Sequence, residues 1–216
     1  GASGNLPEPW SKHPELIGNL LRFEPREQAR QADHILSISV TLWDREEERN
    51  FFIYRGFGGS GSSLFLQNYE YVFKNYETLK QRGPAGLAET WLERSVPVDV
   101  QRVQCRTLDS VLQELNLPFA YHFLKIDAQG AEYQILRGAE RYLRDDCYGL
   151  HLELFELPLY KGITLLGDVR AYLETLGFAM VKQYPAHGTF DSQRDCVFLK
   201  RDRNDPVMAA IRSVYG

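Results

Sequence analysis

The chain has 216 residues, of which 44% are hydrophobic and 25% are charged, and its formal net charge at pH 7 is −4. This length fits one domain with a sizeable core, so we expect residues 1–216 to form a single domain, and the acidic balance argues against a dominant nucleic-acid partner. No apolar run reaches the roughly 20 residues that span a bilayer, and three cysteines without metal-site spacing indicate free thiols and a reducing, cytoplasmic setting.

The first third of the chain reads as short strands joined by polar and glycine-rich segments. The pattern predicts a short helix over 10–16, a strand over 20–25 in which Glu24 is the last residue before proline, and a brief helix over 27–32. A strand over 35–43, a charged hairpin tip over 44–49 and an antiparallel partner strand over 51–54 follow. Residues 56–63 contain four glycines, which favours a loop over a pocket.

Helical patterns cover 67–82 and 87–94, and alternating valines predict a strand over 96–105. Thr107 is the expected N-cap of a helix over 108–115. Towards the C-terminus, a helix over 168–176 should end at Gly177, since glycine suits the left-handed position after a helix. A β-hairpin of 178–184 with 196–200 and a last helix over 205–214 complete the prediction.

The centre of the chain carries the polar residues that are hardest to explain by packing. Residues 123–127 alternate like a strand that places Lys125 and Asp127 on one face, and Gly130 then releases the chain into a helical run over 131–145. A second strand, 150–154, carries His151 and Glu153. Ligands of α/β folds bind beyond the carboxyl ends of the strands, so these four residues suggest a chemical site. Ion pairing at a solvated sheet edge is the alternative.

Gly1, Ala2, Ser3 and Gly4 form a small, flexible stretch that could approach a ligand closely. Glu24 follows about 20 residues later, the distance at which nucleotide-binding βαβ units place an acid on ribose hydroxyls. The alternative is that the glycine stretch is a cloning remnant.

The decapeptide Phe-Leu-Lys-Ile-Asp-Ala-Gln-Gly-Ala-Glu at 123–132, followed by Ile-Leu-Arg-Gly-Ala at 135–139, resembles the signature of the FkbM family of S-adenosylmethionine-dependent methyltransferases. Arg-Thr-Leu-Asp at 106–109, Tyr-Lys-Gly at 160–162, Gly-Phe at 177–178 and Asp195 agree with it. The resemblance implies a Rossmann-like class I methyltransferase fold of the α/β class. Such a fold has a mostly parallel seven-stranded sheet, helices on both faces and a C-terminal antiparallel hairpin. The family's first strand precedes its glycine-rich motif, so we expect this sheet to lack that strand.

The cofactor implied by the resemblance is S-adenosylmethionine. Glu24 would bind the ribose hydroxyls, and Asp127 would lie near the methyl sulfonium. The backbone of the glycine-rich motif would face the methionine portion, and the adenine would be bordered by the strand that ends at Asp44. These further cofactor-binding residues are Gly1, Ala2, Ser3, Gly4, Thr41, Leu42 and Asp44.

A hydroxyl acceptor has to lose its proton as the new bond forms, so such an enzyme needs a base. The candidates are Asp127, Glu153 and His151; we favour the two carboxylates and interpret His151 as a packed strand residue. Lys125 would stabilise the developing alkoxide or orient a carboxylate. No ligand set in the sequence demands a metal, although the same carboxylates could hold a divalent ion.

The sequence thus predicts an O-methyltransferase for a hydroxyl of a sugar or another small-molecule natural product. An RNA 2′-O-methyltransferase and a catalytically inactive binding module of the same fold stay open as alternatives. The expected partner is a small-molecule acceptor, such as a sugar or glycan, with no membrane and no nucleic acid. A homodimer is left open.

Overall fold

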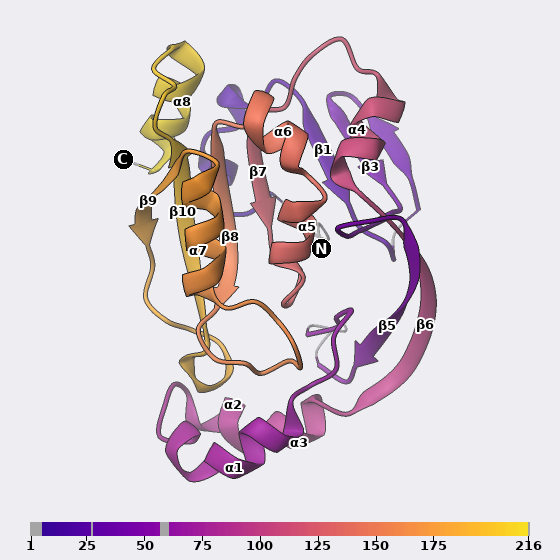
Figure 1. The fold of residues 1–216 in the computed structure, drawn as a ribbon, viewed down its shortest axis with the longest axis vertical. Coiled ribbons are helices and arrows are strands. Elements are labelled where there is room, and N and C mark those ends of the chain that lie inside the picture. The colour runs from indigo at the N-terminus through magenta and orange to yellow at the C-terminus, as the bar shows by residue number, and fades with distance from the viewer. Residues whose placement is uncertain (1–5, 27, 57–60, 216) are drawn as a thin grey trace.

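The computed structural model describes residues 6–26, 28–56 and 61–215. These residues form an α/β fold in which helices pack against mixed β-sheets (Figure 1). Within the described residues the strands fall into three sheets, of three, four and three strands. Among these residues, no helix is long and apolar enough to cross a membrane.

The N-terminal sheet contains one parallel and one antiparallel strand pair. β1 (Leu20–Phe23) runs parallel to β3 (Ile35–Ile38), and β2 (Arg30–Ala32) pairs antiparallel with β3. The helix predicted over 27–32 is therefore wrong for residues 30–32, because pairing with β3 satisfies their backbone groups and overrides a weak helix propensity. Before β1, two 3-10 turns, Trp10–Lys12 and Pro14–Leu16, stand in place of the one helix predicted there.

The strand predicted over 35–43 is divided between two sheets. β3 ends at Ile38, and β4 (Thr41–Leu42) runs parallel to β6 (Pro97–Arg106). β5 (Glu47–Tyr54) also pairs with β6, in antiparallel register, rather than with 35–43 as predicted. Alternation of apolar and polar residues identifies the buried face of a strand but not the neighbouring strand, which is why the predicted pairing of β5 was wrong.

A helical layer lies below the sheets in Figure 1 and consists of α1 (Tyr69–Leu79), α2 (Ala85–Glu89) and α3 (Trp91–Arg94). The side chain of Asn68 caps α1 by accepting the N–H of Tyr71. This layer packs on Phe190 through Trp91 and so attaches the helices to the C-terminal loop region.

The largest sheet has the order β7 (Phe123–Ile126), β8 (Gly149–Phe155), β10 (Gln193–Lys200) and β9 (Phe178–Gln183). β7 runs parallel to β8, whereas β10 is antiparallel to both β8 and β9, which confirms the C-terminal hairpin. The seven-stranded, mostly parallel sheet is not confirmed. Among the described residues β7 pairs only with β8, and the parallel pair of β1 and β3 lies in a separate sheet.

Helices α4 (Leu108–Leu115), α5 (Glu132–Arg137), α6 (Glu140–Asp145) and α7 (Leu166–Thr175) belong to the main core. The oxygen of Thr107 caps α4 by accepting the N–H of Ser110, as predicted. The helix predicted over 131–145 is broken into α5 and α6 at Gly138. A side chain there would overlap the carbonyl oxygen of Trp43, so the chain segment before β5 approaches the backbone directly.

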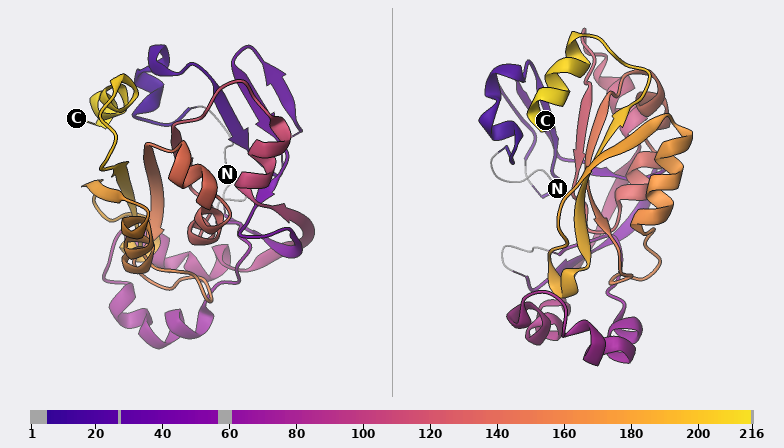
Figure 2. Two further views of the ribbon diagram at one scale, coloured as in Figure 1. Left: turned by 45° about the horizontal axis from the view of Figure 1, so that its top comes forward. Right: turned by 90° about the vertical axis from the view of Figure 1, so that its left-hand side faces the viewer.

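The two faces of the large sheet are covered by different helices. One face presents Leu150, Leu152 and Leu154 of β8 to the main core, whereas α8 (Pro206–Tyr215) packs on the other face. The right-hand view of Figure 2 shows α7 and α8 on opposite sides of the sheet. The α8 cluster includes Phe123 and Leu199, so α8 covers the end of the sheet where β7 begins. The opposite end of the same face, where β7 and β8 finish, carries the polar residues.

Candidate active site

The carboxyl ends of β7 and β8 bring four predicted residues to one neighbourhood. Lys125 is the register partner of His151, and Glu153 is the register partner of Asp195 on β10. Because side chains two residues apart share a face, His151 and Glu153 both lie on the face that α8 partly covers. Asp127 follows directly after the last residue of β7.

A glutamine amide joins the two carboxyl groups. Nε2 of Gln129 donates to Oδ1 of Asp127 at 3.0 Å and to Oε2 of Glu153 at 2.9 Å. A second amide, that of Gln193 on β10, donates to the same oxygen of Glu153 at 2.6 Å. Burial, and next the negative charge of Asp127, raise the pKa of Glu153 well above its usual range. This shift favours the protonated form of Glu153, and we name Asp127 and Glu153 the acid pair.

The loop after β7 is held in a conformation that non-glycine residues rarely adopt. Gln129 has φ +51° and Gly130 has φ +99°. The buried carboxylate of Glu132 fixes this loop by accepting the N–H of Ala128 at 2.7 Å and of Gly130 at 2.9 Å. The hydroxyl of Ser63 adds a bond to the carbonyl of Gln129 at 2.7 Å. Strain held by several bonds at a strand end is typical of functional sites, because it fixes side chains in advance.

Glu132 lies among apolar groups and is only 3% exposed. Burial raises its pKa to about 7, although the hydrogen bonds it accepts act in the opposite direction. Tyr160 contacts the same loop from the segment after β8: its hydroxyl donates to the carbonyl of Gly61 at 2.6 Å and lies 3.4 Å from Oε1 of Gln129. Burial raises the pKa of Tyr160 far above its usual value, so its hydroxyl keeps its proton.

His151 is bonded through both ring nitrogens. Nε2 lies 2.9 Å from Oδ1 of Asp195, and Nδ1 lies 3.1 Å from the hydroxyl of Tyr215. The other oxygen of Asp195 lies 3.1 Å from Nε2 of His187, which is also 3.9 Å from Oε1 of Glu153. Burial acts to raise the pKa of Asp195, but the hydrogen bond from His151 and the basic side chains around it, Lys125 among them, together hold that pKa below its usual range.

The other residues predicted to bind the cofactor lie in or directly after strands of two other sheets. Glu24 follows β1, is 5% exposed, and accepts the N–H of Arg26 at 3.2 Å. Thr41 and Leu42 are buried in β4, and Asp44 follows with an ion pair to Arg45 at 3.0 Å. β1 and β4 lie in sheets other than that of β7, but Leu42 belongs to the same core cluster as Ile126 of β7. The four residues of the predicted glycine-rich motif, Gly1, Ala2, Ser3 and Gly4, lie outside the described residues.

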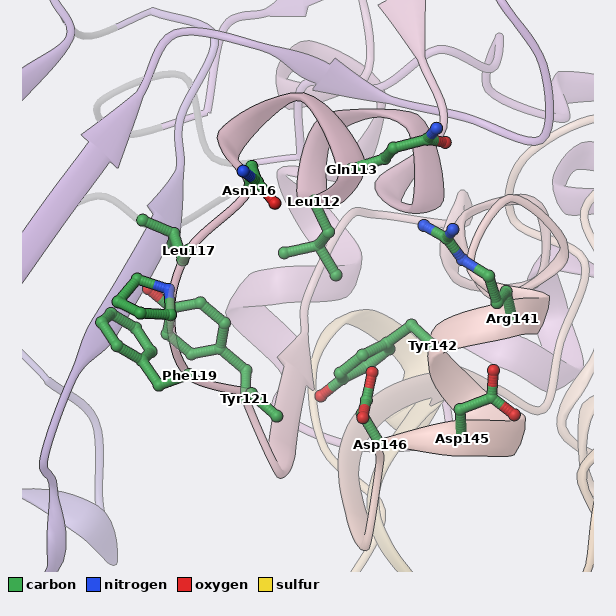
Figure 3. Close-up of a pocket in the computed structure, with 12 residues that line it drawn as sticks. Leu112, Gln113, Asn116, Leu117, Phe119, Tyr121, Arg141, Tyr142, Asp145 and Asp146 are labelled. Atoms are coloured by element: carbon green, nitrogen blue, oxygen red, sulfur yellow. The ribbon is translucent and has the colours of Figure 1, made fainter.

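No group of three or more His, Cys, Asp or Glu side chains in the described parts of the chain is arranged to hold a metal ion. The three cysteines are free and buried. An open hollow of about 670 Å³ lies between the end of α4, the segment before β7 and the end of α6 (Figure 3). Phe119, Tyr121 and Tyr142 line it. Because it adjoins the starts of β7 and β8, it lies at the opposite rim from the acid pair.

Several residues around the acid pair were not singled out from the sequence. Gln129 and Glu132 lie inside the central decapeptide, where the polar residues around Gly130 are the sequence feature that could have indicated them as site residues. His187 and Gln193 reach the site only through the antiparallel pairing of β8 with β10. No spacing along the chain reveals that pairing.

A family model described as "Methyltransferase FkbM domain" matches residues 15–180. This match confirms the resemblance found in the sequence. It spans Asp127 and Glu153 and ends before His187 and Asp195. No curated protein and no solved structure matches the chain.

Proposed function

The chain belongs to the FkbM methyltransferase family, and from that premise we propose that it methylates a hydroxyl group of a sugar or another small molecule, using S-adenosylmethionine. The acid pair at the ends of β7 and β8 carries this proposal. Hydroxyl methylation requires a proton acceptor beside the acceptor oxygen. Asp127 and the protonated Glu153, joined by Gln129, supply one acceptor and one donor at that rim.

The cofactor would supply a methyl group bound to a positively charged sulfur. The described residues fit such a group by their chemistry. Glu24 offers a buried carboxylate at the end of a strand, and hydrogen bonds from two ribose hydroxyls to it would contribute roughly 1.5–3 kcal/mol each. The negative charge of Asp127 suits a site beside a cationic sulfur. In this proposal Thr41, Leu42 and Asp44 border the adenine.

Asp127 is the proposed base. The raised pKa of Glu153 favours its protonated form, so in this proposal its role is to donate a hydrogen bond within the pair. Lys125 lies on the same face of the sheet and would stabilise the developing alkoxide. His151 is enclosed between Tyr215 and Asp195, which supports its interpretation as a packed residue rather than a base.

Methyl transfer is an in-line displacement, so correct placement supplies much of the rate. The loop that carries Asp127 and Gln129 is fixed by Glu132 and by Ser63, and this rigidity supports such a role. A small acceptor is favoured because the groups placed together at this rim include three carboxyl groups, those of Asp127, Glu153 and Asp195. A nucleic acid would need a basic surface.

The cofactor is tested first, by thermal unfolding with S-adenosylmethionine and S-adenosylhomocysteine. A ligand at 100 times its Kd stabilises the folded state by about 2.7 kcal/mol, which corresponds to a Tm increase of about 5–10 °C for a chain of this size. Glu24→Ala should lose most of that increase. If neither ligand raises Tm, the proposal is wrong and a binding module of the same fold is favoured.

The acceptor is then sought by transfer of an isotope-labelled methyl group to a panel of sugars and other small hydroxyl compounds, with mass spectrometry as the readout. Methylation of a small hydroxyl compound that requires Asp127 supports the proposal. Salt-dependent binding of RNA together with labelling of RNA alone would support the nucleic-acid alternative instead.

A further inference from the structure

A series of polar contacts runs from the C-terminal helix into the acid pair. The hydroxyl of Tyr215, at the end of α8, bonds to Nδ1 of His151, and Nε2 of His151 bonds to Asp195. The second oxygen of Asp195 lies 3.1 Å from Nε2 of His187. That nitrogen is in turn 3.9 Å from Glu153. We name this series the relay; it connects α8, β8, β10 and the loop before β10.

The direction of the hydrogen bonds in the relay follows from both of its ends. An anionic Asp195 can only accept, so Nε2 of His151, 2.9 Å away, carries the ring proton. In the neutral ring Nδ1 is then an acceptor, and the hydroxyl of Tyr215 donates to it. The indole nitrogen of Trp10 can only donate, and it donates to the oxygen of Tyr215 at 2.9 Å, which leaves the hydrogen of Tyr215 for His151.

Packing alone does not require these polar groups. Tyr215 stacks on Phe123 with ring centroids 5.5 Å apart and an interplanar angle of 22°, which a phenylalanine would reproduce. His151 is 4% exposed, whereas the neighbouring core positions 150 and 152 of β8 are leucines. A buried imidazole is unfavourable unless both nitrogens are bonded. The hydroxyl of Tyr215 thus serves a hydrogen bond to His151, and Nε2 of His151 serves one to Asp195, rather than the filling of space.

The surroundings of His151 favour an anionic Asp195. The groups that face the ring come from each neighbouring element: Lys125 from β7, Asp195 from β10, Tyr184 from the end of β9 and Tyr215 from α8. Lys125 and the imidazole both act to lower the pKa of Asp195. The other oxygen of Asp195 lies 3.1 Å from Nε2 of His187, but this nitrogen forms no hydrogen bond to the described residues, so the contact is an electrostatic one.

We propose that Tyr215 and His151 are positioning residues for the acid pair: Tyr215 holds the His151 ring by donating to Nδ1, and His151 donates from Nε2 to Asp195, which keeps Asp195 in place beside His187 and Glu153. The side chain of His187 is 39% exposed, so it is the member of the relay that a bound acceptor can contact. The catalytic consequence rests on the proposed function. Which atoms of the relay donate hydrogen bonds and which accept them can be measured without any methyl transfer.

The test compares the full chain with its Tyr215→Phe and Tyr184→Phe variants after labelling the histidines with 15N. Tyr184 is the matched control because it also stacks on His151, at 6.1 Å, while its hydroxyl bonds to none of the described residues. In the wild type and in Tyr184→Phe, His151 should show a protonated Nε2 and an unprotonated Nδ1. In Tyr215→Phe the 15N resonance of Nδ1 should shift towards that of an unprotonated nitrogen without a hydrogen bond, since the donor to Nδ1 is gone, while Nε2 stays protonated beside Asp195.

Turnover supplies the second readout once an acceptor is known. Tyr215→Phe should lower kcat about tenfold and leave KM for the cofactor unchanged. This is the effect expected from losing one hydrogen bond, that of Tyr215 to His151. His151→Gln keeps an amide donor for Asp195, so it should retain more turnover than His151→Leu. An unchanged His151 spectrum in Tyr215→Phe, or equal loss of kcat in Tyr184→Phe, would overturn the proposal. If the wild type transfers no methyl group, the spectra still decide the relay while the proposed function fails.

Discussion

The raised pKa of Glu153 makes a direct prediction about stability. Burial is the largest cause of the shift and the charge of Asp127 is the next. Because the folded-state pKa lies above the unfolded value, the folded protein holds a proton that the unfolded chain has released in the window between the two. The resulting stability is fully present below the unfolded pKa of about 4.3 and is lost as pH rises towards the folded pKa. One such proton gives a slope of about 1.4 kcal/mol per pH unit.

The substitution Glu153→Gln tests this. Glutamine has nearly the same size, can donate to Asp127 as the protonated acid does, and can accept from the amide of Gln129, but it has no proton to lose. Across two pH units inside the window, the wild type should therefore lose about 3 kcal/mol more stability than the variant. All other ionisable groups are the same in both proteins, so comparing the two isolates Glu153.

The assay is urea unfolding at a series of pH values from about 5.5 to about 8, with the m-value checked for constancy. Glu70→Gln on an exposed position of α1 is the control and should follow the wild-type curve. Parallel stability curves for the wild type and Glu153→Gln would refute the reasoning. They would mean that Glu153 is ionised in the folded protein and that the acid pair carries two charges.

Three further changes test the loop, the core and the base. Glu132→Gln should destabilise the fold by about 2 kcal/mol, because an amide can accept only one of the two buried N–H groups, those of Ala128 and Gly130. A change below about 0.5 kcal/mol in chemical denaturation would contradict the stabilising role given to these two hydrogen bonds. Gly138→Ala should cost about 3 kcal/mol or more through overlap with the carbonyl of Trp43, and an unchanged Tm would show that the two backbones can separate. Asp127→Asn should lower kcat more than 100-fold, as expected for loss of a general base, while circular dichroism and binding of S-adenosylhomocysteine, which lacks the cationic sulfur, stay intact. Activity close to wild type would assign the proton transfer elsewhere.

Local structure was largely predictable from the sequence. Helix α4 agrees with its prediction at both ends, because a capping threonine before it and Asn116, at φ +42°, after it are local signals. Gly177, at φ +83°, follows α7 for the same kind of reason. The prediction of one helix over 131–145 was wrong at Gly138, where the backbone of Trp43 packs against the chain. No residue near Gly138 in the sequence indicates this contact.

The sequence by itself determined the family, the central strand–glycine–helix unit and the presence of Asp127 and Glu153 at strand ends, since each depends on residues close together in the chain. Only the tertiary structure decided how those groups behave. Burial and a neighbouring charge set the proton on Glu153, and strand pairing over long sequence distances brought His187 beside it. Desolvation and register depend on the packing of whole elements, and no local pattern of residues encodes either one.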